Sequence, residues 1–128
     1  MTTESDGRTV LVIDDDRVLA DTLSDILRKN GYTPVALYSG EEALELAGRF
    51  KPDVVLSDIR MSRLDGIEAA KRIRILHPAC RIILFTAHTV SAALVQLIHG
   101  LGFELLQRPL HPERVLTALS RNPDPPRA

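Results

Sequence analysis

The chain has no tryptophan, a single cysteine, Cys80, and only two tyrosines and three phenylalanines among its 128 residues. One cysteine excludes an internal disulfide, and no Cys or His spacing typical of a zinc site occurs, so packing alone has to hold the fold together. Neither sign of charge dominates, because 16 Lys and Arg residues face 17 Asp and Glu residues for a net charge of -1. This balance argues against direct binding of nucleic acid, which requires a basic surface.

The sequence also has no hydrophobic run that approaches the roughly 20 residues of a membrane span. Its polar, acidic start lacks the hydrophobic segment of a signal peptide. We therefore expect a cytoplasmic protein without membrane insertion. The length favours one domain. We predict that domain over residues 8–121, between flexible termini at residues 1–7 and 122–128, the second of which is rich in proline.

Five short hydrophobic runs alternate with longer amphipathic stretches. The hydrophobic runs predict strands near residues 9–13, 33–38, 54–58, 81–86 and 103–107. The amphipathic stretches predict helices near residues 17–30, 40–49, 66–76, 91–98 and 112–120. Strands that alternate with helices of this length indicate βαβ units and a parallel sheet covered on both faces. Pro34 indicates that the second strand lies at an edge, because proline cannot donate to a neighbouring strand.

Polar residues follow four of the five predicted strands. They are Asp14, Asp15 and Asp16 after the first strand, Asp58 at the end of the third, Thr86 after the fourth and Arg108 after the fifth. Ligands of open α/β sheets bind beyond the carboxyl ends of the strands. Carboxylates that converge there repel one another unless a cation neutralises them, and oxygen ligands suit Mg²⁺ or Mn²⁺. A metal beside a carboxylate, a hydroxyl and a cation is the set of groups that phosphoryl transfer requires, and the carboxylate itself would be the acceptor.

Four segments resemble the receiver domain of two-component response regulators. They are residues 10–16, residues 52–61 together with 64–66, residues 84–87 and residues 107–109. Each motif alone is weak, but four in the correct order, each at a strand end, make a specific match that covers residues 8–121. The resemblance implies a flavodoxin-like, doubly wound α/β fold with a five-stranded parallel sheet of order 2-1-3-4-5 and helices on both faces.

The resemblance also implies a role for each site residue. Asp58 would accept the phosphoryl group, and Asp14, Asp15 and Asp58 would bind Mg²⁺ or Mn²⁺ together with the backbone carbonyl of Arg60. Thr86 would supply the hydroxyl that moves to bond the phosphoryl group.

The fifth strand ends in the other implied features of the site. Arg108 stands where the family has lysine, so the positive charge is kept on a planar guanidinium. The Arg108–Pro109 bond resembles the family's cis peptide.

Plainer interpretations exist for these residues. Asp14 and Asp15 could be charges that stabilise the start of a helix. Thr86 could end a strand or cap the next helix, and Arg108 could pair with a surface carboxylate. The order of the four motifs favours the functional interpretation.

Further positions depart from the family pattern or flank the site. Ser62 replaces the usual proline, and Leu105 replaces a common aromatic switch residue. Arg60 and His88 lie two residues beyond Asp58 and Thr86, so they flank the expected path of attacking water and should affect how long the phosphoryl group persists.

The predicted function is that of a signalling phosphoacceptor with Mg-dependent phosphotransfer and self-dephosphorylation, not of a metabolic enzyme. The donor would be a phosphohistidine of a histidine kinase or histidine phosphotransfer protein. The signal would pass to an effector protein or a fused output domain, and a homodimer would form through the fourth helix, fifth strand and fifth helix. The alternative is an unphosphorylated receiver that binds partners constitutively. A phosphatase is a poor match, because no second acid lies two residues after Asp58.

Overall fold

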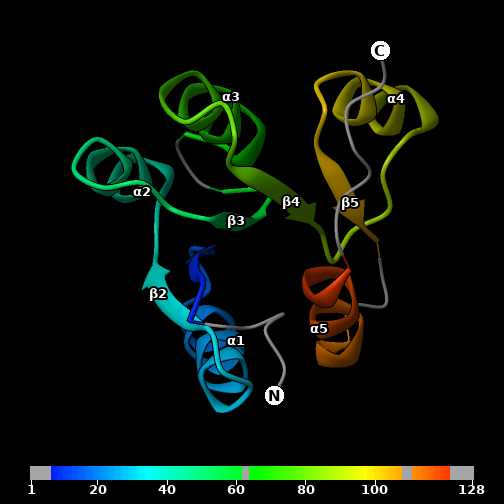
Figure 1. Cartoon of the computed structure of the whole chain (residues 1–128). Helices are drawn as coiled ribbons and strands as arrows, with labels where there is room; N and C mark the ends of the chain where they lie inside the picture. The colour runs from blue at the N-terminus through cyan, green and yellow to red at the C-terminus, as the bar shows by residue number, and fades with distance from the viewer. Residues whose placement is uncertain (1–6, 62–63, 108–110, 122–128) are drawn as a thin grey trace.

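The computed structural model describes residues 7–61, 64–107 and 111–121, and Figure 1 shows how strands and helices alternate along them. The strands are β1 (Thr9–Ile13), β2 (Thr33–Leu37), β3 (Val54–Asp58), β4 (Arg81–Phe85) and β5 (Glu104–Leu106). The helices are α1 (Arg17–Lys29), α2 (Gly40–Ala47), α3 (Gly66–Leu76), α4 (Ala92–Gly100) and α5 (Pro112–Ser120). Within these described ranges, no helix is long and apolar enough to cross a membrane.

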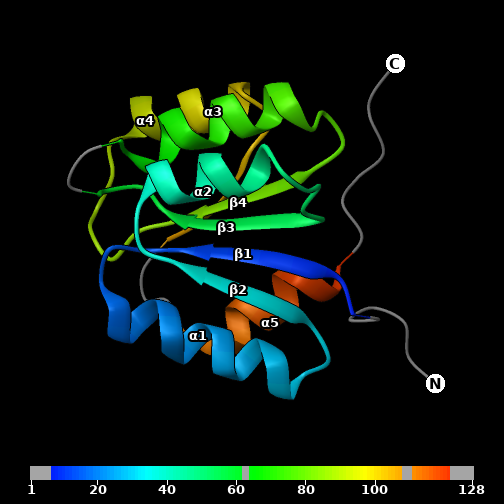
Figure 2. The ribbon, with the colours of Figure 1, turned by 90° about the vertical axis from the view of Figure 1, so that its left-hand side faces the viewer.

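The five strands form one parallel sheet in the order β2-β1-β3-β4-β5. Figure 2 shows α1 and α5 on one face of this sheet and α2, α3 and α4 on the other. This arrangement is the doubly wound, flavodoxin-like fold. The fold class and the strand order predicted from the sequence are therefore confirmed.

Both faces of the sheet are buried, which explains why the strands are continuous hydrophobic runs and not alternating patterns. Along β1, Val10 and Val12 pack into the core that contains residues of α1 and α5, whereas Leu11 and Ile13 pack into the core that contains residues of α2 and α3. All four side chains are fully buried. Each contributes about 1.5–3 kcal/mol through its removal from water.

Two features hinder the pairing of another strand with the edge strand β2. Pro34 lacks an N–H group, as expected for an edge position. The N–H of Asp14 donates to the carbonyl oxygen of Leu37 at 3.0 Å, so residue 37 faces β1 and residues 36 and 38 turn their backbone outward. The outward N–H of Tyr38 donates to the Glu42 carboxylate at 2.8 Å. The Glu42 side chain of α2 therefore occupies the outward N–H group just beyond the end of β2.

Several elements are shorter than the sequence predicts, and β5 and α2 differ by two residues each. Phe103 was expected to open the fifth strand, but its N–H donates to the carbonyl oxygen of Ile98 and completes the end of α4 instead. The second helix was expected to reach Arg49, yet it ends at Ala47, with Gly48 as its C-cap. Both differences arise because helix ends require partners for their last carbonyl groups.

Arg81, at the start of β4, joins three elements. Its guanidinium forms two short bonds to the Glu104 carboxylate of β5, at 2.6 and 2.7 Å. The same group donates to the carbonyl oxygens of Ala118, at 2.6 Å, and of Arg121, at 3.0 Å. The Arg81 side chain is only 9% exposed. It therefore caps the C-terminal end of α5 from inside the structure.

Candidate metal centre

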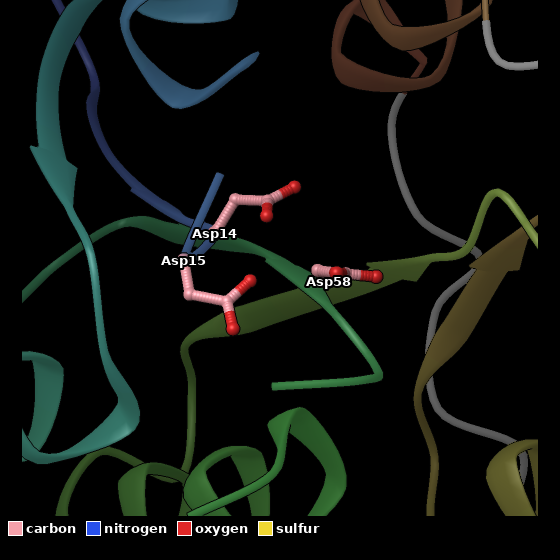
Figure 3. A group of neighbouring side chains, drawn as sticks. All are labelled: Asp14, Asp15 and Asp58. Carbon is pink, nitrogen blue, oxygen red and sulfur yellow. The ribbon is translucent and has the colours of Figure 1, made fainter. Parts of the chain in front are cut away.

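Three carboxylates meet at the carboxyl edge of the sheet, as Figure 3 shows. Asp14 and Asp15 follow β1 directly, and Asp58 is the last residue of β3. Because β1 and β3 are parallel neighbours with Ile13 beside Ser57, Asp14 comes level with Asp58. One oxygen from each of the three carboxylates lies within 4.8 Å of the others. The sequence prediction that these three residues come together is confirmed, whereas their role as metal ligands remains a prediction.

Asp14 is the most buried of the three, with 2% of its surface exposed. One carboxylate oxygen accepts a hydrogen bond from the Asp16 N–H at 2.9 Å. The other oxygen, Oδ2, is buried and has no hydrogen-bond partner among the described residues. Burial raises the pKa of Asp14 to about 7, the bond from Asp16 opposes this rise, and repulsion from Asp58 and Asp15 adds to it.

The unpaired Asp14 oxygen is compatible with a bound cation. A buried carboxylate oxygen without a partner is costly, and a bound metal ion removes that cost. The donors are all oxygens, which fits Mg²⁺ or Mn²⁺ better than zinc or copper. The residues present therefore fit the implied metal.

Asp58 is half-buried, and its exposure lies between those of Asp14 and Asp15. Burial is the main cause that raises its pKa, and repulsion from Asp15 adds to it. Hydrogen bonds from the backbone N–H groups of Arg60 and Ile59, and the charge of His88, act in the opposite direction. The pKa of Asp58 therefore reflects opposing influences, of which burial is the largest.

Gly66 fixes the main chain at Asp58. A Cβ atom on this residue would overlap the main-chain carbonyl oxygen of Asp58. The Gly66 N–H also donates to the carbonyl oxygen of Ile59 at 2.9 Å, so α3 begins directly against the end of β3. This glycine was not among the predicted site residues, because the close approach depends on how two turns pack. The only signal was its place after Asp65 within the family-like motif.

Thr86 directly follows β4, the strand whose last residue pairs with Asp58. Phe85, its predecessor, pairs with Asp58, and the Ile59 N–H donates to the Phe85 carbonyl oxygen at 3.0 Å. Thr86 is fully buried, and its hydroxyl oxygen accepts a hydrogen bond from the His88 N–H at 3.0 Å. The threonine therefore occupies the edge of the sheet where the sequence places it, one residue beyond the partner of Asp58.

The remaining predicted residues have other outcomes. Asp16 leaves the cluster, because its side chain caps α1 by accepting the Leu19 N–H at 3.2 Å. Leu105 is half-buried in β5. Arg60 is exposed beside Asp58. The predictions for Ser62, Arg108 and Pro109 lie outside the described residues.

Doubly wound α/β domains with a cluster of carboxylates at the carboxyl edge of the sheet carry out many different functions. Comparison with known families narrows it. Residues 10–120 match the family model described as the response regulator receiver domain. The chain therefore belongs to this family, and the resemblance that the four motifs implied is confirmed.

Known relatives support the assignment. The chain is 34% identical over 116 residues to the chemotaxis protein CheY of Thermotoga maritima, a match that covers 90% of this chain and 97% of that protein. It is also 34% identical to the DNA-binding transcriptional regulator NtrC of Escherichia coli, over 88% of this chain but only 24% of that protein. Among solved structures, CheY4 of Vibrio cholerae superimposes with a TM-score of 0.80 at 30% identity, over 88% of this chain and 95% of that one.

Proposed function

We propose that this receiver domain accepts a phosphoryl group on Asp58 and passes the signal on through a change of its surface. The observation that carries the proposal is the carboxylate centre itself. Its three acids lie within 4.8 Å of one another, and a buried oxygen of Asp14 lacks a partner among the described residues. A cluster of this kind can bind a cation, and a cation beside a nucleophilic carboxylate is the arrangement that phosphoryl transfer uses.

Asp14, Asp15, Asp58 and the backbone carbonyl of Arg60 would hold the Mg²⁺ or Mn²⁺ ion. When bound, the ion neutralises charge that develops on the transferred phosphoryl group. The carboxylate of Asp58 forms the new O–P bond while the P–N bond to the donor imidazole breaks, and the electron pair of that bond returns to the imidazole nitrogen.

Thr86 and Arg108 would respond to the new charge. The Thr86 oxygen is an acceptor for the His88 N–H, so its own proton is available to donate to a phosphoryl oxygen. Arg108 would bring a positive charge to the same group. Arg60 and His88 are both exposed at the site, and we propose that they influence the access of attacking water and thus the lifetime of the phosphoryl group.

The proposed donor is a phosphohistidine of a histidine kinase or a histidine phosphotransfer protein, in the cytoplasm. Receiver relatives occur as short chemotaxis proteins and as parts of longer transcriptional regulators, so the effector could be a separate protein or a fused output domain. The chain spans about a quarter of NtrC and of the transcriptional regulatory protein ZraR. We propose no direct contact with nucleic acid.

We also propose that α4, β5 and α5 form the surface that changes conformation on phosphorylation. Two copies of the protein would associate through this surface. The composition of α4 supports this proposal. Most of its residues are apolar, yet only Ile98 is buried, and Leu97 is 53% exposed. A helix of this kind is expected to be covered by a partner.

Phosphorylation can be tested directly. The protein is incubated with a small phosphodonor and Mg²⁺, and its intact mass is measured. We expect the mass of one phosphoryl group on the wild type and none on Asp58→Asn. Asp16→Asn is a matched control, because this neighbouring aspartate caps α1 outside the cluster and asparagine is an equally good cap.

An unlabelled wild type, under conditions that label a known receiver, would contradict the proposal. The alternative of an unphosphorylated binding module would then gain weight, although the comparisons give it no support. Calorimetric titration with Mg²⁺ separates the two: binding that is lost in Asp15→Ala and Asp58→Ala favours the phosphoacceptor.

A further inference from the structure

The corner between β2 and α2 touches the segment that follows the phosphoacceptor. A Cβ atom built on Gly40 would lie 2.8 Å from the main-chain oxygen of Leu64 and 3.2 Å from two carbons of its side chain. A side chain at position 40 would therefore displace the backbone at Leu64, because a main-chain oxygen cannot move aside as a flexible side chain can. Only glycine permits this contact.

Neither helix formation nor backbone conformation explains a glycine at position 40. In the first turn of a helix, glycine costs up to about 1 kcal/mol relative to alanine. The described glycines with positive φ are Gly7, Gly31 and Gly102, and Gly40 is not one of them. Its close approach to Leu64 is thus the feature of the structure that requires it.

The corner that carries Gly40 is tied to the first metal-binding segment. The Asp14 N–H donates to the Leu37 carbonyl oxygen at 3.0 Å, which joins the end of β2 to the acidic residues after β1. The Ser39 hydroxyl then accepts the Glu42 N–H at 3.1 Å and caps α2. Since Glu42 also accepts the Tyr38 N–H, each residue from Leu37 to Ser39, directly before Gly40, takes part in a hydrogen bond.

The segment after Asp58 is held at its beginning as well. Ile59 is 6% exposed, and its N–H donates to the Phe85 carbonyl oxygen of β4. Arg60, whose carbonyl is the proposed fourth protein ligand, lies between this fixed residue and Leu64. Leu64 precedes Gly66 by two residues, and the Gly66 N–H donates to the Ile59 carbonyl oxygen at 2.9 Å. The contact of Leu64 with Gly40 is therefore a second point that restrains the residues packed against Asp58.

We infer that Gly40 is a positioning residue for the metal centre. By letting α2 approach Leu64, it sets the separation between Asp58, against which Gly66 packs, and the segment of Asp14 and Asp15. The identity of the ion rests on the proposed function, whereas the restraint on the segment after Asp58 does not. A side chain at position 40 would displace Leu64. The metal ligands would then be held less firmly, although none of them is itself changed.

The test is Gly40→Ala, with Gly100→Ala as a matched control, because a Cβ on Gly100 meets nothing within 4 Å. Calorimetry measures Mg²⁺ affinity well below the midpoint of thermal unfolding of each variant. Amide exchange of Ile59 and Gly66 is followed by NMR in the absence of metal. We expect Gly40→Ala to weaken Mg²⁺ binding roughly tenfold and to speed exchange at both amides, and Gly100→Ala to change neither.

Unchanged exchange and unchanged Mg²⁺ affinity in a folded Gly40→Ala protein would overturn the inference. If the wild type itself fails to bind Mg²⁺, the proposed function fails, and amide exchange alone then decides the positioning role. If Gly40→Ala does not fold, Leu64→Ala replaces it, because it removes Cδ2, the outer side-chain atom of Leu64 that lies nearest to Gly40. Faster exchange in Leu64→Ala supports the inference, and wild-type exchange contradicts it.

Discussion

The carboxyl group of Asp14 has an energetic consequence of its own. In an unfolded chain it titrates near 3.8, whereas burial raises its pKa to about 7 in the folded protein. Between these two pH values the folded state keeps a proton that the unfolded state has released. The contribution of the protonated Asp14 carboxyl to the free energy of unfolding is therefore fully present below pH 3.8 and is lost as pH rises to about 7.

This linkage predicts that Asp14→Asn stabilises the metal-free protein at pH 8. The gain should reach up to about 4 kcal/mol, the equivalent of the pKa difference, and should vanish near pH 4. Urea unfolding of wild type and variant across this range measures it. Asp25→Asn is the control, because this exposed residue pairs with Arg28 on the surface. A gain that is equal at both pH values would show that ionisation of Asp14 is not its cause.

At the scale of single residues, the sequence predicted the positions that strand ends determine. Asp14, Asp15 and Asp58 could be placed together because parallel strands end at one edge. Gly40 and Gly66 could not, since their role depends on contacts between turns that the sequence pattern does not reveal. Asp16 belongs to the same acidic run as Asp14 and Asp15, and only its backbone geometry shows that it caps a helix.

At the scale of elements, α4 allows a sharp test of the proposed dimer surface. Leu97→Glu should reduce association of the protein in the presence of Mg²⁺ and beryllium fluoride, a phosphoryl analogue, because it places a charge on the uncovered helix. Sedimentation velocity measures the dimer fraction. Ile75→Glu is the matched control, since Ile75 is 78% exposed on the neighbouring helix α3.

Association that falls equally in both variants would indicate a general effect of charge and not an interface on α4. Association that persists in Leu97→Glu would exclude this residue from the dimer surface. A wild type that stays monomeric with the analogue would contradict the dimer itself while leaving the phosphorylation of Asp58 untouched.

The order and type of the elements could be predicted because hydrophobic periodicity reflects burial on both faces of a parallel sheet. The ends of elements were less accurate. Phe103 is as apolar as the strand that comes after it, so its periodicity cannot reveal that its N–H completes α4. Such choices are made by hydrogen-bond partners, which the pattern of side chains does not encode.

At the scale of the molecule, Arg81 joins segments that are far apart in the chain. Arg81→Met would leave the Glu104 carboxylate and the last carbonyls of α5 without this donor. We expect a loss of about 3 kcal/mol in the free energy of unfolding, measured by urea denaturation. Arg28→Met should cost little, because its partner Asp25 is exposed. Similar losses in both variants would show that the Arg81 contacts are no more than a surface pair.

The same contacts hold the C-terminal end of α5 in place. Arg81 begins β4, and Asp58 pairs with the other end of that strand, which places the Arg81 backbone about 13 Å from Asp58 at the rise of a parallel strand. Because Arg81 bonds the carbonyl oxygens of Ala118 and Arg121, a displacement at the acidic edge would move the Pro112 end of α5 more than its last turn.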